Sequence, residues 1–151
     1  HPLLEKHAND FGRTFLEGVK FGATMTPEVW GFAADQRHTL NMWCADIFEQ
    51  FDLLVTPTVP YDAPPAGGPF PPETEGRPQV LAGPGSFTIP FNLSWHPAAT
   101  VRVGLSQAGL PMGMQIVGPR HRDDLVLQAA RAFERERPWH PHWAPTWAPR
   151  A

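Results

Sequence analysis

Several features are scarce in this sequence, and each scarcity argues against one class of protein. The single cysteine, Cys44, excludes an internal disulfide framework and a thiolate-rich zinc site. The net charge of −3 provides no basic excess, so we expect no binding to DNA through its phosphates. No apolar run approaches the roughly 18–20 residues that a bilayer-spanning helix needs, so we expect no membrane partner. One cysteine and no export signal favour a cytoplasmic location.

The composition that remains is that of a chain able to build a core. Of the 151 residues, 42% are hydrophobic and 11% are aromatic, which is too much apolar mass for a disordered protein. This length predicts one domain. The 19 prolines are the outlier, and many of them fall between residues 57 and 86.

Three segments carry helix signals. Apolar spacing of three and four residues predicts one helix over residues 3–19, or two short helices broken near residues 9–10. The run Thr26-Pro27-Glu28 is typical of a helix N-terminus, and it predicts a long amphipathic helix over residues 29–51. A last helix is expected to begin at Asp123-Asp124 and to end before Pro138.

The strand signals are short and apolar. Residues 53–55 predict a buried strand, and residues 98–105 and 112–117 predict an antiparallel hairpin joined at Ser106–Gly109. Between them, Thr88 is expected to cap a short helical turn. Helices with a small sheet indicate an α/β class.

The Pro- and Gly-rich stretch at about residues 57–86 tolerates neither helix nor strand for long. An ordered loop of this length in a compact domain is usually a lid or a binding loop. A flexible linker is the alternative, and the sequence does not decide between the two.

No complete catalytic set is visible. An activated nucleophile needs a base within reach, and no serine here lies in a glycine-flanked nucleophile elbow. Both lysines, Lys6 and Lys20, fall in the first helical region, and Cys44 is expected to be a buried thiol. The serines are Ser86, Ser94 and Ser106.

The histidines offer candidates of different strength. His140 and His142 could together coordinate a metal ion, but the proline between them and the lack of a nearby carboxylate argue against a metal site. His38 beside Arg37, and His96 beside Trp95, are candidates for a polar pocket; structural roles for them remain open.

Six stretches, taken in order, resemble the C-terminal part of the amidase signature family of amide hydrolases. Their order and spacing match the family's pattern across nearly the whole chain. They are FDLLVTPT at 51–58, FTIPFNL at 87–93, PA at 97–98, GLPMGMQIVG at 109–118, FE at 133–134 and PW at 138–139.

The resemblance implies a mixed β-sheet layered between helices, of which this chain would form an incomplete part. Catalysis in the family resembles attack by a serine that a lysine primes through a second, cis-linked serine. Those groups lie upstream of the resembling segments, so residues 1–151 are expected to form a C-terminal segment with no catalytic residue of their own. No metal and no cofactor are expected. The start at His1, without a Met, fits this expectation.

The resemblance also implies where substrate would bind. In the family, the long helix, the proline-rich loop and the segment 87–97 help to wall the acyl pocket. We therefore expect a small amide substrate, and the candidate substrate-binding residues are Arg37, Phe87, Trp95 and His96.

Two positions bear on the branch of the family. Arg37 corresponds to an arginine that grips the glutamine carboxylate in the glutaminase component of the tRNA-dependent amidotransferases. The aspartate that would hold the substrate ammonium in that branch is replaced by Gly85. A desolvated charge needs a partner, so a general amidase acting on an aryl, alkyl or carbamoyl-type amide is preferred. A non-catalytic interaction module and a glutamine-hydrolysing amidotransferase component remain alternatives.

Arg102 departs from the family, which commonly has proline there, so the local strand geometry is open. Strands of such a sheet normally bury both faces. We expect apolar surface that is covered by the upstream part of the same polypeptide, by another chain, or by a homodimer partner.

Overall fold

The structure is a computed structural model that describes residues 2–78 and 85–139. The chain divides into two compact units, His1–Thr39 and Leu40–Ala151, and α3 (Pro27–Gln50) contributes residues to both. The metal-site prediction for His140 and His142 falls outside the described residues.

The first unit is helical, as the apolar spacing predicted. It contains α1 (Pro2–His7), the 3-10 helix η1 (Ala8–Asp10), α2 (Arg13–Gly22) and the first half of α3. The break near residues 9–10 is therefore confirmed. Thr26 begins α3 as predicted: its hydroxyl accepts a hydrogen bond from the Val29 amide at 3.4 Å, which satisfies one free donor of the first turn.

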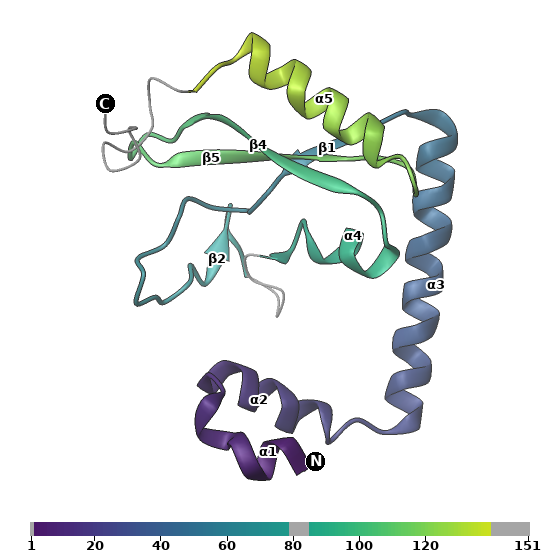
Figure 1. Ribbon diagram of the computed structural model, residues 1–151, viewed down its shortest axis with the longest axis vertical. Coiled ribbons are helices and arrows are strands. Elements are labelled where there is room, and N and C mark those ends of the chain that lie inside the picture. Colours follow the sequence, from purple (N-terminus) through teal and green to yellow (C-terminus); the bar gives the residue numbers. More distant parts are fainter. Residues whose placement is uncertain (1, 79–84, 140–151) are drawn as a thin grey trace. The chain divides into compact units, whose positions relative to one another are not determined.

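The second unit is built on a three-stranded antiparallel sheet in the order β1-β5-β4 (Figure 1). β1 is Leu54–Pro57, β4 is Ala98–Leu105 and β5 is Pro111–Val117. The predicted hairpin is confirmed, and its turn uses Gly109 at a φ of 77°, a conformation that favours glycine. The pairing slips between Arg102 and Gly104, so the strand is irregular where the sequence departs from the family.

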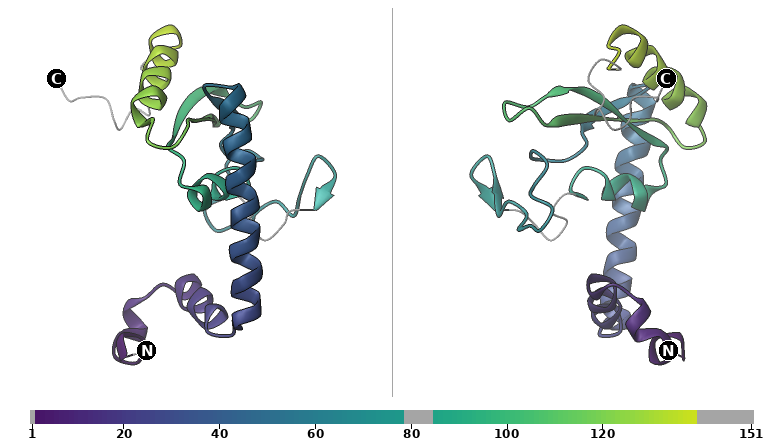
Figure 2. Two further views of the ribbon diagram at one scale, coloured as in Figure 1. Left: turned by 90° about the vertical axis from the view of Figure 1, so that its right-hand side faces the viewer. Right: turned by 60° about the vertical axis from the view of Figure 1, so that its left-hand side comes forward.

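Helices cover the two faces of this sheet. α4 (Ile89–Ser94) lies on one face and α5 (Asp123–Glu136) lies on the other, while the end of α3 runs past one end of the sheet (Figures 1 and 2). On the first face, Cys44, Phe91 and Val117 form a buried cluster. On the second face, Val126 of α5 packs closely against Gly118. A Cβ atom at Gly118 would lie only 2.7 Å from Cγ2 of Val126, so this packing requires a residue without a side chain.

The long connection between β1 and α4 has little regular structure. Its described part contains a two-residue pair, β2 (Glu73–Thr74) with β3 (Arg77–Pro78). The prediction that the Thr88 hydroxyl caps α4 is wrong. Thr88 already has helical dihedrals, with φ −98° and ψ −35°, and its hydroxyl donates backward to the Gly85 carbonyl at 3.4 Å. None of the described helices has the length and apolar character needed to span a bilayer.

Candidate functional site

The segment 85–96 folds into a compact turn-helix-turn unit against the sheet. The Thr88 amide donates to the Gly85 carbonyl at 3.0 Å, which closes a turn just before α4. At the other end, Trp95 adopts the left-handed conformation, with φ 61° and ψ 39°. This lets the His96 amide return to the Phe91 carbonyl at 3.1 Å and satisfy an orphan carbonyl of the helix end.

Gln115 fastens the start of this segment to the sheet. Its side-chain amide, from the middle of β5, donates to the carbonyl of Phe87 at 2.9 Å. The same nitrogen donates to the hydroxyl of Thr56 on β1 at 3.0 Å. The Gln115 residue is only 3% exposed. A buried amide with two satisfied donors fixes both partners in place.

His96 packs into the end of the segment rather than projecting from it. Its ring stacks on Phe48 with centroids 5.1 Å apart, and its Nδ1 atom lies 2.8 Å from the hydroxyl of Ser94. Burial, followed by the positive charge of Arg120, lowers the pKa of His96 below the ordinary 6.5, and an interaction with the backbone of Ser94 opposes this only partly. The imidazole is therefore kept neutral near pH 7.

Arg120 closes the same region from the connection that follows β5. Its Nε atom donates to the Ser94 carbonyl at 2.9 Å, and its Nη2 atom donates to Oδ1 of Asn41 at 2.6 Å. A small cavity of about 220 Å³ lies among Asn41, Cys44, Phe48, His96 and Arg120. The side chains that line this cavity already interact with one another: Arg120 with Asn41, and His96 with Phe48. These interactions indicate a structural role for the cluster.

Cys44 lies on the wall of this cavity and is fully buried, as predicted. Burial raises the pKa of its thiol, and the hydroxyl of Ser94 and the charge of Arg120 oppose that effect only partly. Because the thiolate is the nucleophilic form, Cys44 is not an activated nucleophile. Ser94 is fully buried as well.

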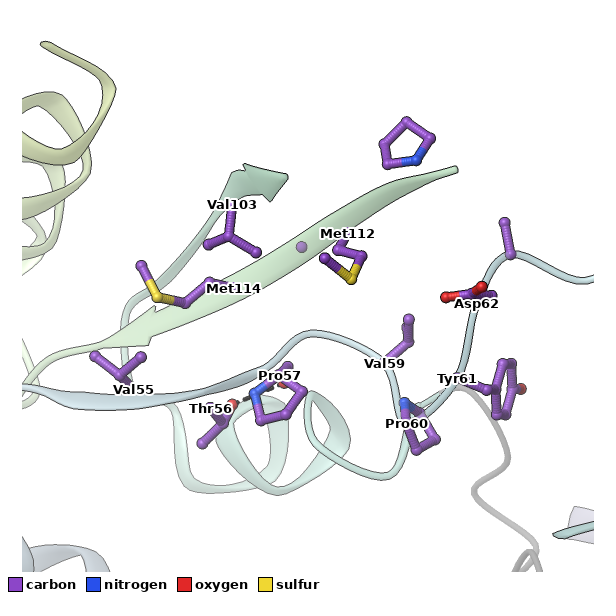
Figure 3. Close-up of a pocket in the computed structure, with 13 residues that line it drawn as sticks. Val55, Thr56, Pro57, Val59, Pro60, Tyr61, Asp62, Val103, Met112 and Met114 are labelled. Carbon is purple, nitrogen blue, oxygen red and sulfur yellow. Dashed lines mark hydrogen bonds between the residues drawn. The ribbon is translucent and has the colours of Figure 1, made fainter. Parts of the chain in front are cut away.

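A second, larger hollow of about 560 Å³ opens on the sheet face that carries α5. Val55, Val103 and Met114 lie toward one end, and Val59 and Asp62 toward the other (Figure 3). We call this hollow the apolar groove. Its lining includes exposed hydrophobic residues: Val55 is 55% exposed and Met112 is 40% exposed. The described part of the chain holds no group of three His, Cys, Asp or Glu that could bind a metal ion.

The four predicted substrate-binding residues belong to two different units of the chain. Phe87 and His96 are half-buried within the segment 85–96, whereas Trp95 is 73% exposed. Arg37 is half-buried on the portion of α3 that belongs to the first unit. Because Arg37 belongs to a different unit from the other three residues, its role stays a prediction.

Sequence reasoning missed two residues that organise the site. Gln115 carried a signal, because it is a polar residue inside the otherwise apolar strand of residues 112–117. Arg120 carried none: an arginine after Gly118-Pro119 has the pattern of an ordinary loop residue.

Comparison with known proteins gives a consistent result. Residues 11–127 match a family model described as Amidase. The chain is 41% identical over 93 residues to the A subunit of glutamyl-tRNA(Gln) amidotransferase from Cyanothece sp., covering 62% of this chain and 18% of that protein. It is 38% identical over 96 residues to the 6-aminohexanoate-cyclic-dimer hydrolase of Pseudomonas sp., covering 59% of this chain and 20% of that protein.

A solved structure extends the match to the fold. The chain superposes with a TM-score of 0.75 and 29% identity on a bacterial aryl acylamidase described as one of the amidase signature enzymes. The superposition covers 92% of this chain and 29% of that one, which confirms the predicted fold class. The chain spans about a fifth of the length of the two curated relatives.

Proposed function

The chain belongs to the amidase family, as its motifs predicted, and we propose that it forms the C-terminal part of an amide hydrolase. In this role the segment 85–96 forms one wall of the substrate pocket, and the strands β1, β4 and β5 extend the central sheet. The observation that carries the proposal is the family match over residues 11–127 in a chain whose Cys44 and Ser94 are fully buried.

The proposed chemistry is cleavage of an acyl–nitrogen bond by a serine, primed through a second serine by a lysine. These groups would come from sequence outside this chain. The residues support this division: Lys6 and Lys20 are the only lysines, and both fall in the first unit. In the second unit, Cys44 and Ser94 are fully buried. The His96 imidazole lies 2.8 Å from the Ser94 hydroxyl, but that hydroxyl is buried away from any substrate.

The proposed substrate is an aryl, alkyl or carbamoyl-type amide rather than glutamine. Gly85 offers no carboxylate to pair with an amino-acid ammonium, and the space beside it is filled. A Cβ at Gly85 would lie 2.6 Å from Cδ1 of Ile89, so a side chain there requires Ile89 to move. An unpaired ammonium in a desolvated pocket is costly, which disfavours glutamine.

Within the pocket, we propose that Phe87 and His96 contribute apolar wall, and that Trp95 closes over the substrate from its exposed position. Arg37 is proposed to contact substrate from α3. His96 is held neutral by its surroundings, which suits an apolar acyl group better than a carboxylate.

A covering partner is also proposed. β1 is an edge strand of the described sheet, and the apolar groove lies beside it. An unpaired edge next to exposed apolar surface is normally covered. The occupant we propose is an upstream part of the same polypeptide, with a second chain or a homodimer partner as the alternatives. A cytoplasmic location is proposed from the single cysteine.

The test compares the 151-residue chain with the full product of its gene, including any codons before His1. Hydrolysis of an anilide, an alkyl amide, a carbamoyl amide and glutamine is measured for both. We expect turnover of the first three by the longer protein, lost on Ser→Ala in an upstream Gly-Ser-rich loop, and none by the short chain. Turnover by the short chain that Ser86→Ala abolishes would overturn the proposal. A gene that begins at His1 would favour a non-catalytic module.

A further inference from the structure

Gln115 is a buried polar residue in a strand that is otherwise apolar. It is 3% exposed, and its neighbours Ile116 and Val117 are among the most buried residues of the described core. Burying an amide costs free energy unless its donors are satisfied. In the structure, both N–H donors of the Gln115 amide bond to specific acceptors. These two hydrogen bonds distinguish Gln115 from the apolar core residues around it.

The two acceptors belong to different segments of the chain. Thr56 lies directly opposite Gln115 in the β1–β5 ladder, and its hydroxyl accepts at 3.0 Å. The carbonyl of Phe87 accepts at 2.9 Å, from outside the sheet. Because a primary amide has two N–H donors, both are committed. The hydroxyl of Thr56 in turn donates to the Pro57 carbonyl at 2.9 Å.

The bond to Phe87 acts within the turn that precedes α4. Phe87 lies between Gly85 and Thr88, whose backbone bond at 3.0 Å closes the turn before α4. This turn comes directly after the proline-rich connection. The Gln115 amide therefore anchors residues 85–88 at the first turn that the structure describes after that connection. Without that donor, the Phe87 carbonyl would lose its partner at a half-buried position.

We propose that Gln115 is a positioning residue that sets the place of Phe87 and, through it, the wall formed by residues 85–96. Calling this segment a pocket wall rests on the proposed function; the anchoring itself does not. Neither close isostere of glutamine can replace it: methionine has a similar volume but no N–H donor, and a glutamate carboxylate is an acceptor that cannot donate to the Phe87 carbonyl.

The anchoring is tested on the 151-residue chain by amide hydrogen exchange, comparing Gln115→Met with the wild type. We expect exchange of the Phe87 and Thr88 amides to rise about tenfold more than that of the Val101 and Ile116 amides in the sheet, the size expected for loss of one or two hydrogen bonds. The control is Gln128→Met, the same change at an exposed position on α5, which should alter neither region.

A second variant keeps the test decisive if Gln115→Met does not fold. Thr56→Val removes the acceptor on β1, keeps the shape, and leaves the bond to Phe87. Exchange at Thr88 should then stay within about twofold of the wild type, whereas Gln115→Asn, one methylene too short, should raise it. An equal rise across the sheet and the segment in Gln115→Met, or a larger effect of Thr56→Val than of Gln115→Asn, would overturn the proposal.

The link to catalysis is tested separately in an active, longer protein. There, Gln115→Met should raise KM for an amide with a large acyl group about tenfold, and should leave kcat for a small amide nearly unchanged. An equal loss for both amides would overturn the positioning role in catalysis. If no longer protein hydrolyses an amide, the proposed function fails, and the exchange experiment still decides the anchoring.

Discussion

The Nη2 atom of Arg120 lies 2.6 Å from Oδ1 of Asn41, a residue 79 positions earlier in the sequence. Through its Nε atom, Arg120 also holds the Ser94 carbonyl at the end of α4, at 2.9 Å. One guanidinium therefore ties α3, α4 and the connection after β5 together. Cys44 lies on α3, and His96 lies two residues after the end of α4.

Arg120→Met should destabilise the chain by about 1–2 kcal/mol, because it removes two charge-assisted bonds at a partly exposed site. A double-mutant cycle with Asn41→Ala should give a coupling free energy of about 0.5–1 kcal/mol, measured by urea unfolding. Arg131→Met on the exposed side of α5 is the matched control and should change the free energy of unfolding by less than about 0.5 kcal/mol. Strict additivity of the Arg120 and Asn41 variants would show that the bond contributes nothing.

Cys44 should be protected from thiol reagents while the chain is folded. It is fully buried, and burial raises the pKa of the thiol. Reaction with a chromogenic disulfide at about pH 8 should therefore be at least tenfold slower in buffer than in denaturant. As Cys44 is the single cysteine, the final yield should be one thiol per chain. Equal rates in buffer and denaturant would contradict the burial.

Gly118→Ala should destabilise the second unit by about 1–3 kcal/mol, the usual cost of overpacking. The added Cβ would lie 2.7 Å from Cγ2 of Val126, which is only 2% exposed and has little space to move. Gly104→Ala is the control, because its Cβ would meet Met112 Cε at an ordinary 3.7 Å. Urea unfolding of both variants tests this, and similar midpoints would contradict the close contact of α5 with the sheet.

The helices and the hairpin could be predicted because local chemistry decides them. Thr26 begins α3 with a hydroxyl bond to the Val29 amide, and Gly109 supplies the positive φ of the hairpin turn. Each depends on neighbours within a few residues. The resemblance of the motifs likewise predicted the family and the α/β class.

The details of the site could not be predicted, because they depend on contacts between distant residues. Gln115 bonds to Phe87 across 28 residues, and Arg120 bonds to Asn41 across 79. The predicted hydroxyl cap at Thr88 was wrong for a different, local reason. The turn from Gly85 places Thr88 in a helical conformation, and its hydroxyl donates back to the Gly85 carbonyl.

His96 should make the free energy of unfolding depend on pH. Burial and the charge of Arg120 lower its pKa in the folded state below the ordinary 6.5, so on acidification the unfolded chain binds the proton first. The contribution of His96 to stability is therefore constant above about pH 7.5. It is lost as the pH falls below about 6.5 toward the folded-state pKa, by no more than about 1.4 kcal/mol per pH unit for one proton.

Urea unfolding of the wild type and of His96→Gln between about pH 5 and pH 7.5 measures this loss. The variant keeps a polar partner for Ser94 and does not titrate, so its stability should fall less steeply on acidification. In Arg120→Met, the pKa of His96 measured by NMR should rise, because one of the two lowering causes is removed. Parallel stability curves for the wild type and His96→Gln would show that the imidazole titrates equally in both states, and would contradict the effect of burial and of the Arg120 charge on His96.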